Sequence, residues 1–339
     1  MRVMRFIMAC LTVLVLLLSL GCSSEPEQAP PSVEQAEQKR VLAFGGGPTG
    51  GTFNFFANKM ASIISKQYEW LDVSPRGSGG SAENLRTLNK NGLDLAIVYS
   101  GDAYLGRNGK LPGDKARYED VRALSFLYGA PAQLVVRKDS DIQSPMDLVD
   151  RVVAVGNPGS GAALSAERFF RHIGMWDKIK TRNLGYSRAA SELVSRKIDA
   201  FWVLVGYPNS SIIEAASHLP IRLIGLHQVS LKTGFYDVYP FYSMVEIPAN
   251  TYDGQERKVM TFQDSSLWCA SVKMPEEVVY DCLRAIYSEH GLEDMVMAHK
   301  AAKGMSKASG ILGVSIPLHP GALRFWQGQG LDIPAHLMP

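Results

Sequence analysis

A chain of 339 residues, 46% of them hydrophobic, is long enough for two packed lobes and too apolar to be disordered. Its 35 basic and 33 acidic residues leave a formal net charge of only +2, without a long run of either sign. This balance argues against a nucleic-acid partner, because neutralising phosphates requires a basic surplus on one face.

The amino-terminal residues predict export from the cytoplasm. An uncharged stretch, 6–21, follows two arginines, and residues 18–22 resemble a bacterial lipoprotein box. The stretch is shorter than the roughly 20 residues of a transmembrane helix, which makes a spanning anchor the weaker alternative. We expect a signal peptide at 1–21 and a lipid on Cys22 that anchors the protein outside the cytoplasm, in the periplasm or at the cell surface. Residues 22–40 are rich in Glu, Gln, Pro, Ser and Ala, which predicts a flexible tether.

The folded part retains Cys269 and Cys282 of the chain's 4 cysteines. The first lies in an expected strand and the second in an expected helix. Outside the cytoplasm a disulfide between them is allowed, although two separately buried thiols are the interpretation we favour.

Strands alternate with helices along the folded part, which predicts an α/β architecture with largely parallel sheets. In the first half we expect strands at 41–44, 71–74 and 94–100, a helix after Thr52, a helix at 82–90, and a pair of strands at 121–128 and 133–136.

The pattern then starts again. We expect a strand at 152–155, a helix at 162–173, a strand at 198–205 and a helix with Pro208 in its first turn. In each half a Gly/Ser turn joins a strand to a helix, and an aspartate, Asp94 or Asp199, later heads an apolar strand. This weak internal repeat indicates two facing lobes.

The turn after the first strand is dense in glycine and allows several ligand classes. Gly45, Gly47 and Gly50 match the G-x-G-x-x-G spacing of dinucleotide sites, but residues 74–76 at the end of the next strand include no acid to hold a ribose. Gly51 stands where a phosphate-binding loop would have its lysine. A nucleotide site is therefore disfavoured, and no cofactor is expected.

Helix starts offer a simpler way to bind an anion. Their unpaired N–H groups and partial positive charge attract negative groups, and glycines let a ligand approach the backbone. The turns before Thr52, Ser81, Ala162 and Asn209 are rich in glycine or hydroxyl residues. Any one of them could be an ordinary capped connection, but their recurrence in both halves favours a cleft that binds a carboxylate.

Short motifs follow one another along almost the whole folded part. They are 49–53, 79–85, 94–96, 136–139, 155–161, 199–200, 206–208, 247–248 and 317–322. In order and spacing these motifs resemble those of the TAXI proteins, the extracytoplasmic solute receptors of TRAP transporters. No single motif is decisive, whereas the series is specific.

The resemblance implies a type II periplasmic-binding-protein fold, in which two α/β lobes are joined by two crossing segments with the ligand cleft between them. We place the crossings near 130–136 and 239–247. Residues 41–132 and 245–339 would then form lobe 1, and residues 133–244 would form lobe 2.

The resemblance also implies a function without catalysis. Such receptors close their lobes on a small solute, and the closed form docks on the subunits of a TRAP membrane permease. The solutes of the family lead us to expect a small organic anion: a glutamate- or glutamine-like amino acid, a dicarboxylate or an oxo-acid. A receptor of the same fold that signals to a membrane sensor kinase is the alternative.

The expected solute contacts come from three Gly/Ser turns and from tyrosines that follow strands. They are Thr49, Gly51, Thr52, Ser78, Ser81, Tyr99, Ser160, Gly161, Ala162, Gly206 and Tyr207. Both tyrosines could equally belong to the core. Ala162 stands where the family usually has Thr, which predicts an altered solute preference. Arg76 and Arg188 are candidates for pairing with a second carboxylate of the solute, with solvated surface as the alternative.

Enzymatic alternatives find little support in the sequence. Ser160 lies on a strand-to-helix turn, as a hydrolase nucleophile does, but Pro158 replaces the first Gly of G-x-S-x-G. The 7 histidines form no H-E-x-x-H motif, so that no metal site is expected.

Overall fold

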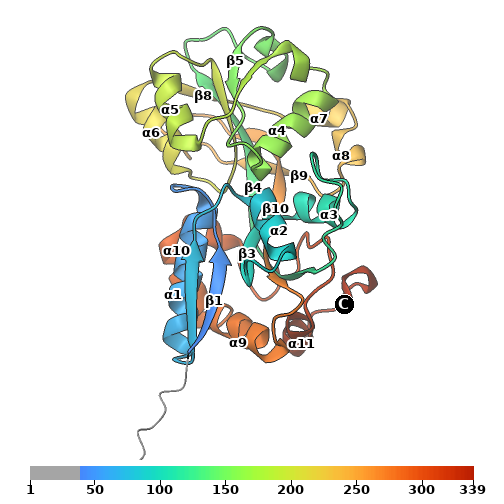
Figure 1. Ribbon diagram of the computed structural model, residues 1–339. Coiled ribbons are helices and arrows are strands. Elements are labelled where there is room, and N and C mark those ends of the chain that lie inside the picture. Colours follow the sequence, from blue (N-terminus) through green and yellow to red (C-terminus); the bar gives the residue numbers. More distant parts are fainter. Residues whose placement is uncertain (1–38) are drawn as a thin grey trace, which may run out of the picture. The chain divides into compact units, whose positions relative to one another are not determined.

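The computed structural model describes residues 39–339, which form one unit with two α/β lobes (Figure 1). The expected signal peptide, most of the expected tether and Cys22 lie outside the described residues. The first strand begins at Arg40, the last residue assigned to the tether. Within 39–339, no helix combines the length and the apolar character that a bilayer crossing requires.

The first sheet contains the N-terminal strands and two long strands. Its members are β1 (Arg40–Gly45), β2 (Leu71–Arg76), β3 (Leu95–Tyr99), the first part of β4 (Val121–Arg137), β9 (Ser243–Ile247) and β10 (Val259–Ser271). β1 is parallel to both β2 and β3, whereas β10 runs antiparallel to β3, β4 and β9. The carboxyl ends of β1, β2 and β3 therefore meet at one edge, where ligands bind in sheets of this kind.

The second sheet is assembled around the last part of β4. It adds β5 (Val152–Ala154), β6 (Lys180–Arg182), β7 (Ala200–Leu204) and β8 (Ile221–Ile224). β5 is parallel to β6 and β7, and β4 pairs antiparallel with β7 and β8. The ends of β5, β6 and β7 consequently open at a common edge as well.

Helices cover both sheets. They are α1 (Thr52–Gln67), α2 (Ser81–Asn89), α3 (Ser100–Arg107), α4 (Gly161–His172), α5 (Tyr186–Val194), α6 (Ser210–His218), α7 (His227–Lys232), α8 (Phe235–Val238), α9 (Glu276–Ile286), α10 (Glu289–Ala298) and α11 (Pro320–Gly328), with short 3-10 turns at Pro145–Leu148, Trp176–Lys178, Lys300–Gly304 and Ala335–Leu337. α1 shows the common cause: Phe53, Phe56, Met60 and Ile64 recur at helical spacing and are buried.

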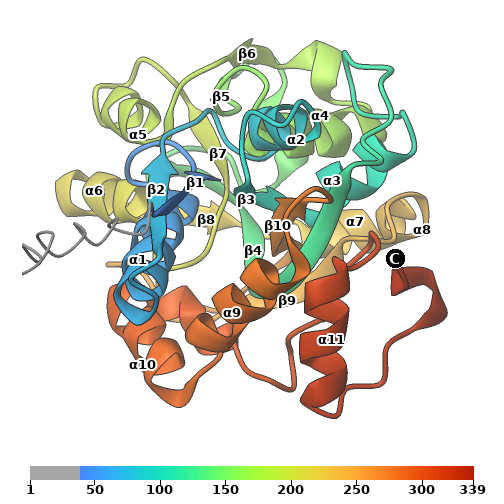
Figure 2. The ribbon, with the colours of Figure 1, turned by 60° about the horizontal axis from the view of Figure 1, so that its bottom comes forward.

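Three helices from the end of the chain pack together on the first lobe. Figure 2 shows α9 between α10 and α11. α9 carries Cys282, whereas Cys269 lies in β10, and both thiols are free and buried. The structure thus agrees with the favoured interpretation of separate thiols.

The two strands expected at 121–128 and 133–136 are a single strand, β4, of 17 residues. Its partner changes from β10 at Pro131 to β7 at Ala132. Pro131 lacks the backbone N–H that a regular ladder requires. Here it occupies the point at which the strand leaves one sheet and enters the other.

β10 carries the second passage between the lobes. Its Phe262 packs against Trp202 and Phe169 on the second-lobe side, and its Trp268 stacks on Phe44 of β1. The expected crossing segment, 239–247, leads instead into β9, which pairs with the first residues of β10. Two lobes joined by two strands confirm the expected fold class.

Pro208 does not open a helix as the sequence indicated. It precedes α6, and Asn209 is the N-cap residue. The Asn209 side-chain oxygen accepts hydrogen bonds from the backbone N–H groups of Ser211 and Ile212, at 3.1 and 3.3 Å. The cap therefore comes from the amide that follows the proline.

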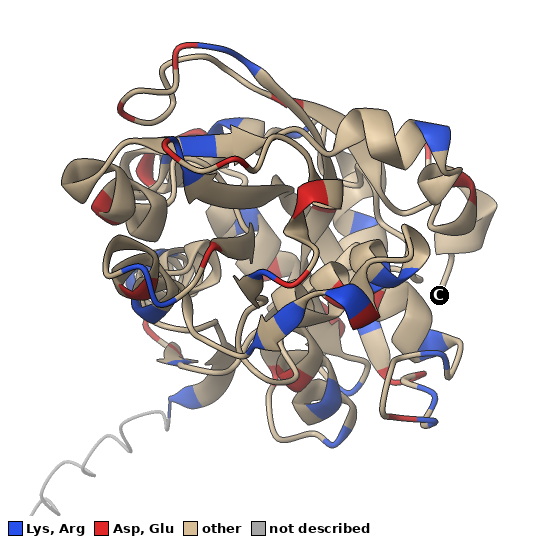
Figure 3. Ribbon diagram, turned by 90° about the horizontal axis from the view of Figure 1, so that it is seen from above, with Lys and Arg blue, Asp and Glu red and all other residues tan. Residues whose placement is uncertain are grey.

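Charged residues are interspersed over the fold rather than gathered by sign. In Figure 3, segments with Lys or Arg alternate with segments that carry Asp or Glu. Some opposite charges link neighbouring helices, as Lys59 of α1 does with Asp294 of α10 at 3.2 Å. Over the described residues, opposite charges thus compensate each other locally.

Candidate functional site

The candidate site is a pocket between the lobes, at the facing carboxyl edges of their parallel strands. Its lining residues are Pro48, Gly51, Thr52, Phe53, Gly79, Gly80, Ser81 and Tyr99 from the first lobe, and Asn157, Ser160, Gly161, Ala162, Tyr186 and Val205 from the second. Each lobe therefore supplies turns that directly follow its strands, and none of these lining residues carries a charged side chain.

Four helices begin at this pocket, namely α1 and α2 of the first lobe and α4 and α5 of the second. Side chains do not cap α1, α2 or α5, whose N-cap residues are Gly51, Gly80 and Gly185. In α4, the Ser160 hydroxyl accepts a hydrogen bond from the Ala163 N–H at 3.0 Å. Uncapped N–H groups and the positive ends of four helix dipoles form an arrangement that can attract an anion.

Glycine allows the two lobes to approach each other at this place. A Cβ on Gly161 would lie 2.5 Å from Cδ2 of Tyr99 and 2.8 Å from Cβ of Ser81, both in the opposite lobe. Gly80 has a φ of 119°, a conformation that other residues rarely adopt. Glycine at positions 80 and 161 thus allows the lobes to contact each other closely and would allow a ligand to approach the backbone.

Hydroxyl groups hold the turns of the first lobe together. The Ser81 hydroxyl accepts a hydrogen bond from the Tyr99 N–H at 2.8 Å. The Ser78 hydroxyl donates to the Gly46 carbonyl at 3.0 Å and accepts from the Gly80 N–H at 3.1 Å. Ser78, an expected solute contact, therefore ties two turns together instead of lining the pocket.

Two tyrosines wall the pocket and share one acceptor. The Tyr99 hydroxyl donates to the Leu204 carbonyl of the other lobe, and the Tyr186 hydroxyl donates to the same oxygen at 3.3 Å. Burial raises the pKa of both phenols. Their O–H groups are already engaged, so that they present mainly ring surface to a ligand.

The structure brings seven of the expected contacts together in this pocket: Gly51, Thr52, Ser81, Tyr99, Ser160, Gly161 and Ala162. Thr49 is exposed, and Gly206 packs against the Tyr128 ring. Tyr207 lines a separate pocket together with Lys300 and Lys303. After β7 the chain turns away, so that only Val205 of this segment lines the site.

Neither candidate arginine lines the pocket. Arg76 is exposed at the end of β2. Arg188 is 71% exposed, and its Nε donates to Glu192 of the same helix at 3.0 Å. Both side chains therefore lie on the surface outside this pocket in the described structure.

Sequence reasoning overlooked Tyr186, Asn157 and Phe53. Tyr186 follows β6, a strand of only 3 residues that no periodicity reveals. The helix start itself was visible, since Gly185 precedes Tyr186 and Ser187. That signal could have placed α5 beside the other three helix starts.

A buried ion pair joins the lobes next to the pocket. Arg168 of α4 donates to Asp102 of α3, with side chains 5% and 1% exposed. Arg168 also donates to the Tyr242 hydroxyl at 2.6 Å. Nearby, the Asp264 carboxyl of β10 accepts a hydrogen bond from the Gly101 N–H at 3.1 Å. Burial, and after it the negative charge of Asp102, raises the pKa of Asp264 to about 8.

A pocket between two α/β lobes, lined by helix starts from both, defines a protein with the architecture of periplasmic substrate-binding proteins. MatC from Rhodopseudomonas palustris, described with bound malate, is similar in fold, with a TM-score of 0.51 and 15% identity over 78% of this chain and 88% of that one. The chain belongs to the NMT1-like family, which matches residues 44–330.

Two further solved structures resemble this chain more weakly. One is a protein of Bordetella bronchiseptica RB50, with a TM-score of 0.49 and 16% identity over 88% of this chain and 91% of that one. The other is the periplasmic aliphatic sulphonate binding protein SsuA of Escherichia coli, with a TM-score of 0.43 and 14% identity over 77% and 79%. By their descriptions, SsuA and other structural neighbours are substrate-binding proteins rather than enzymes.

Proposed function

We propose that this protein is an extracytoplasmic receptor of the TAXI type, which captures a small organic anion and delivers it to a TRAP membrane permease. The observation that carries the proposal is the meeting of four helix N-termini, two from each lobe, at one pocket without charged lining residues. A negative solute held there would bridge the lobes through main-chain N–H groups.

Closure of the lobes would couple solute binding to delivery. Contacts across the pocket already include a hydrogen bond from the Ser210 hydroxyl to the Gly50 carbonyl, at 3.1 Å. A solute that touches both lobes adds contacts that exist only in the closed form. It shifts the equilibrium between the open and closed forms by the difference in its affinity for the two. Micromolar affinity needs about −8 kcal/mol, which a few hydrogen bonds to a charged group and apolar burial can supply.

The lobe limits belong to the same proposal. Residues 41–132 would belong to one lobe and residues 133–244 to the other, with β4 and β10 flexing where they cross. The expected limit at 245 falls before the crossing in β10, whose Phe262 still packs on the second lobe, so that the second lobe would extend into β10. Export and the lipid on Cys22 are also proposed; mass spectrometry of the membrane fraction, with Cys22→Ala as the control, tests the lipid.

A thermal-shift screen of the purified protein against amino acids, dicarboxylates, oxo-acids and short monocarboxylates tests the proposal. A ligand at 100 times its dissociation constant adds about 2.7 kcal/mol to the free energy of unfolding. At least one small anion should raise the melting temperature, whereas stabilisation by neutral sugars alone would contradict the proposal. Loss of solute uptake in a deletion strain would support transport, and intact uptake would favour the signalling alternative.

A further inference from the structure

We infer that the solute is a small monocarboxylate with an uncharged remainder, and that the pocket discriminates against amino acids and dicarboxylates. This inference rests on the proposed function and narrows its solute class. The inference depends on which charges of a solute the groups of the pocket can compensate and which they cannot.

An α-ammonium group finds no counter-charge in the pocket. None of the lining residues is Asp or Glu. The nearby carboxylate of Asp102 is behind Gly161, since a Cβ on Gly161 would lie 2.6 Å from its Oδ2. Arg168 binds Oδ1 of Asp102, whereas Oδ2 has no hydrogen-bond partner within the described residues, and Asp102 does not line the pocket. Removing an ammonium from water without a partner is costly, so that a zwitterion loses affinity relative to its oxo analogue.

The ion pair beside the pocket adds no net charge. Asp102 and Arg168 carry opposite charges and are both buried. Asp264 would make the cluster negative if it were ionised, but its pKa of about 8 keeps most of it protonated at neutral pH. The positive electrostatic potential in the pocket therefore comes mainly from the N-termini of the helices.

One carboxylate matches the donors that the pocket supplies. The starts of α1, α2 and α5 are free of side-chain caps, and Gly51, Gly80 and Tyr186 at these starts line the pocket. A second carboxylate would need an additional cation, and neither Arg76 nor Arg188 lines the pocket.

Thr52 gives an independent sign that a polar ligand group belongs here. It is 1% exposed, and it lines the pocket in the first turn of α1. Its Oγ1 makes no hydrogen bond of regular geometry within the described residues, although the buried Tyr128 hydroxyl is a close neighbour. An unsatisfied buried hydroxyl is costly. A carboxylate oxygen at the start of α1 would accept its hydrogen bond.

The remaining surface suits an apolar chain with at most one neutral polar group. Phe53, Tyr99, Tyr186 and Val205 contribute rings and an aliphatic side chain, while both tyrosine hydroxyls bond to Leu204. The amide of Asn157 is the one side-chain amide among the described lining residues. A 2-oxo or 2-hydroxy group on a short apolar chain fits this set.

The first experiment compares two pairs of ligands by isothermal titration calorimetry, and the members of each pair share a carbon skeleton. We would titrate the protein with 4-methyl-2-oxopentanoate, leucine, 2-oxoglutarate and glutamate. The monocarboxylate oxo-acid should bind at least about tenfold more tightly than the other three. Tighter binding of leucine, glutamate or 2-oxoglutarate would overturn the inference and leave the proposed function intact, whereas binding of no anion at all would reject both.

A variant pair tests the role of Thr52 in binding the carboxylate. Thr52→Val keeps the shape but removes the hydroxyl, and it should weaken the preferred anion about tenfold with little change in the circular dichroism spectrum. Thr181→Val, on the exposed part of β6, is the control and should bind as the parent does. Equal affinity of Thr52→Val and parent would remove Thr52 from the site, and the ligand series still decides the solute class if Thr52→Val fails to fold.

Discussion

Two neighbouring sets of contacts hold the lobes together, and they use opposite chemistry. The pocket relies on helix starts and neutral side chains, whereas the adjacent cluster relies on the charged pair Asp102–Arg168. Neutral dipoles cost little when water refills an open cleft, but a buried pair depends on both partners being present. We therefore expect the pocket to select the solute and the ion pair to control how readily the lobes separate.

The largest effect is expected when one partner of the buried pair is removed. Arg168→Ala leaves Asp102 without compensation, which should destabilise the closed form by about 3 to 5 kcal/mol. Through closure, solute affinity should fall by about 100-fold or more. Calorimetry measures the affinity, and small-angle scattering with saturating solute measures the closed fraction.

Arg171→Ala provides the matched control on the same helix. Arg171 is 53% exposed and pairs with Glu167 at 2.7 Å, a type of surface pair worth about 0 to 1 kcal/mol. Its variant should bind and close as the parent does. If both variants behaved alike, the buried pair would have no part in closure.

A smaller effect is expected from a methyl group placed between the lobes. Gly161→Ala would set a Cβ against Tyr99 and Ser81, and overpacking of this kind costs about 1 to 3 kcal/mol. Because the clash exists only when the lobes meet, solute affinity should fall by about 10- to 100-fold while the free protein keeps its stability.

Gly328→Ala is the corresponding control, since its Cβ would meet nothing within 4 Å at the end of α11. It should leave affinity unchanged. A Gly161→Ala protein that binds like the parent would show that the lobes close with more space between them than described here.

The pH dependence of stability should expose the protonated carboxyl in the cluster. Asp264 has a folded-state pKa of about 8, raised mainly by burial and then by Asp102, whereas an unfolded aspartate titrates near about 3.9. Between these values the folded protein binds more protons than the unfolded one, so that stability should fall as pH rises from about 4 to 8.

Asp264→Asn keeps the acceptor for the Gly101 N–H and removes the titration. Denaturant melts of both proteins at pH 5, 6.5 and 8 provide the measurement. The loss of stability with rising pH that Asp264 causes should vanish in the variant. Asp102, Arg168 and Tyr242 still face position 264, and they are the same in both proteins. Parallel curves for parent and variant would contradict a protonated Asp264.

Local signals allowed much of the pocket to be anticipated. Glycine and hydroxyl residues between a strand and a helix marked the turns that carry Gly51, Ser81 and Gly161, and the structure brings these turns together. The Asp102–Arg168 pair could not be found in this way, because its partners lie 66 positions apart on helices of different lobes. Likewise, the sequence predicts two strands at 121–128 and 133–136, since only tertiary structure shows that β4 is continuous and changes partner after Pro131.

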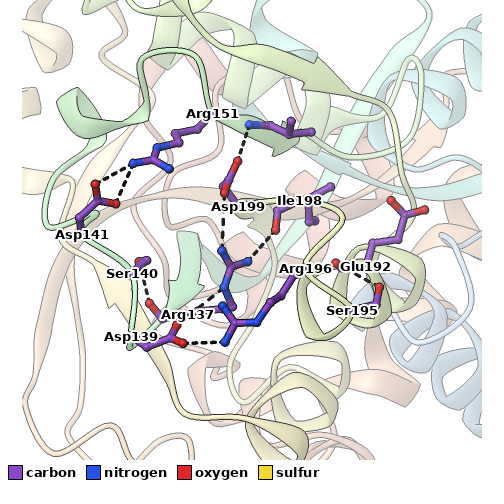
Figure 4. Close-up of polar contacts among 11 residues, drawn as sticks. Arg137, Asp139, Ser140, Asp141, Arg151, Glu192, Ser195, Arg196, Ile198 and Asp199 are labelled. Carbon is purple, nitrogen blue, oxygen red and sulfur yellow. Dashed lines mark hydrogen bonds and ion pairs between the residues drawn. The ribbon is translucent and has the colours of Figure 1, made fainter.

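The smallest effects are expected in an exposed ion cluster at the far end of β4 (Figure 4). There Arg196 pairs with Asp139 at 2.7 Å, with both side chains more than half exposed. Arg137 is only 11% exposed, donates to the Ile198 carbonyl at 2.8 Å and lies 3.5 Å from Asp199. Arg196→Ala should change the free energy of unfolding by about 0 to 1 kcal/mol, and added salt should erase the change.

Arg137→Ala should cost more, about 1 to 3 kcal/mol, because the partly buried Ile198 carbonyl loses its hydrogen-bond donor and Asp199 loses an ion-pair partner. Urea melts at low and high salt separate these outcomes. We expect the loss of unfolding free energy in Arg137→Ala to be independent of salt, and the loss in Arg196→Ala to be salt-dependent or absent. This outcome would mean that burial, rather than the number of ion pairs, determines the electrostatic contribution to stability. Equal losses in the two variants would instead mean that the exposed and buried members of this cluster act as one network. The Asp102–Arg168 pair would then differ from this cluster because it joins two lobes, and not because it is more buried.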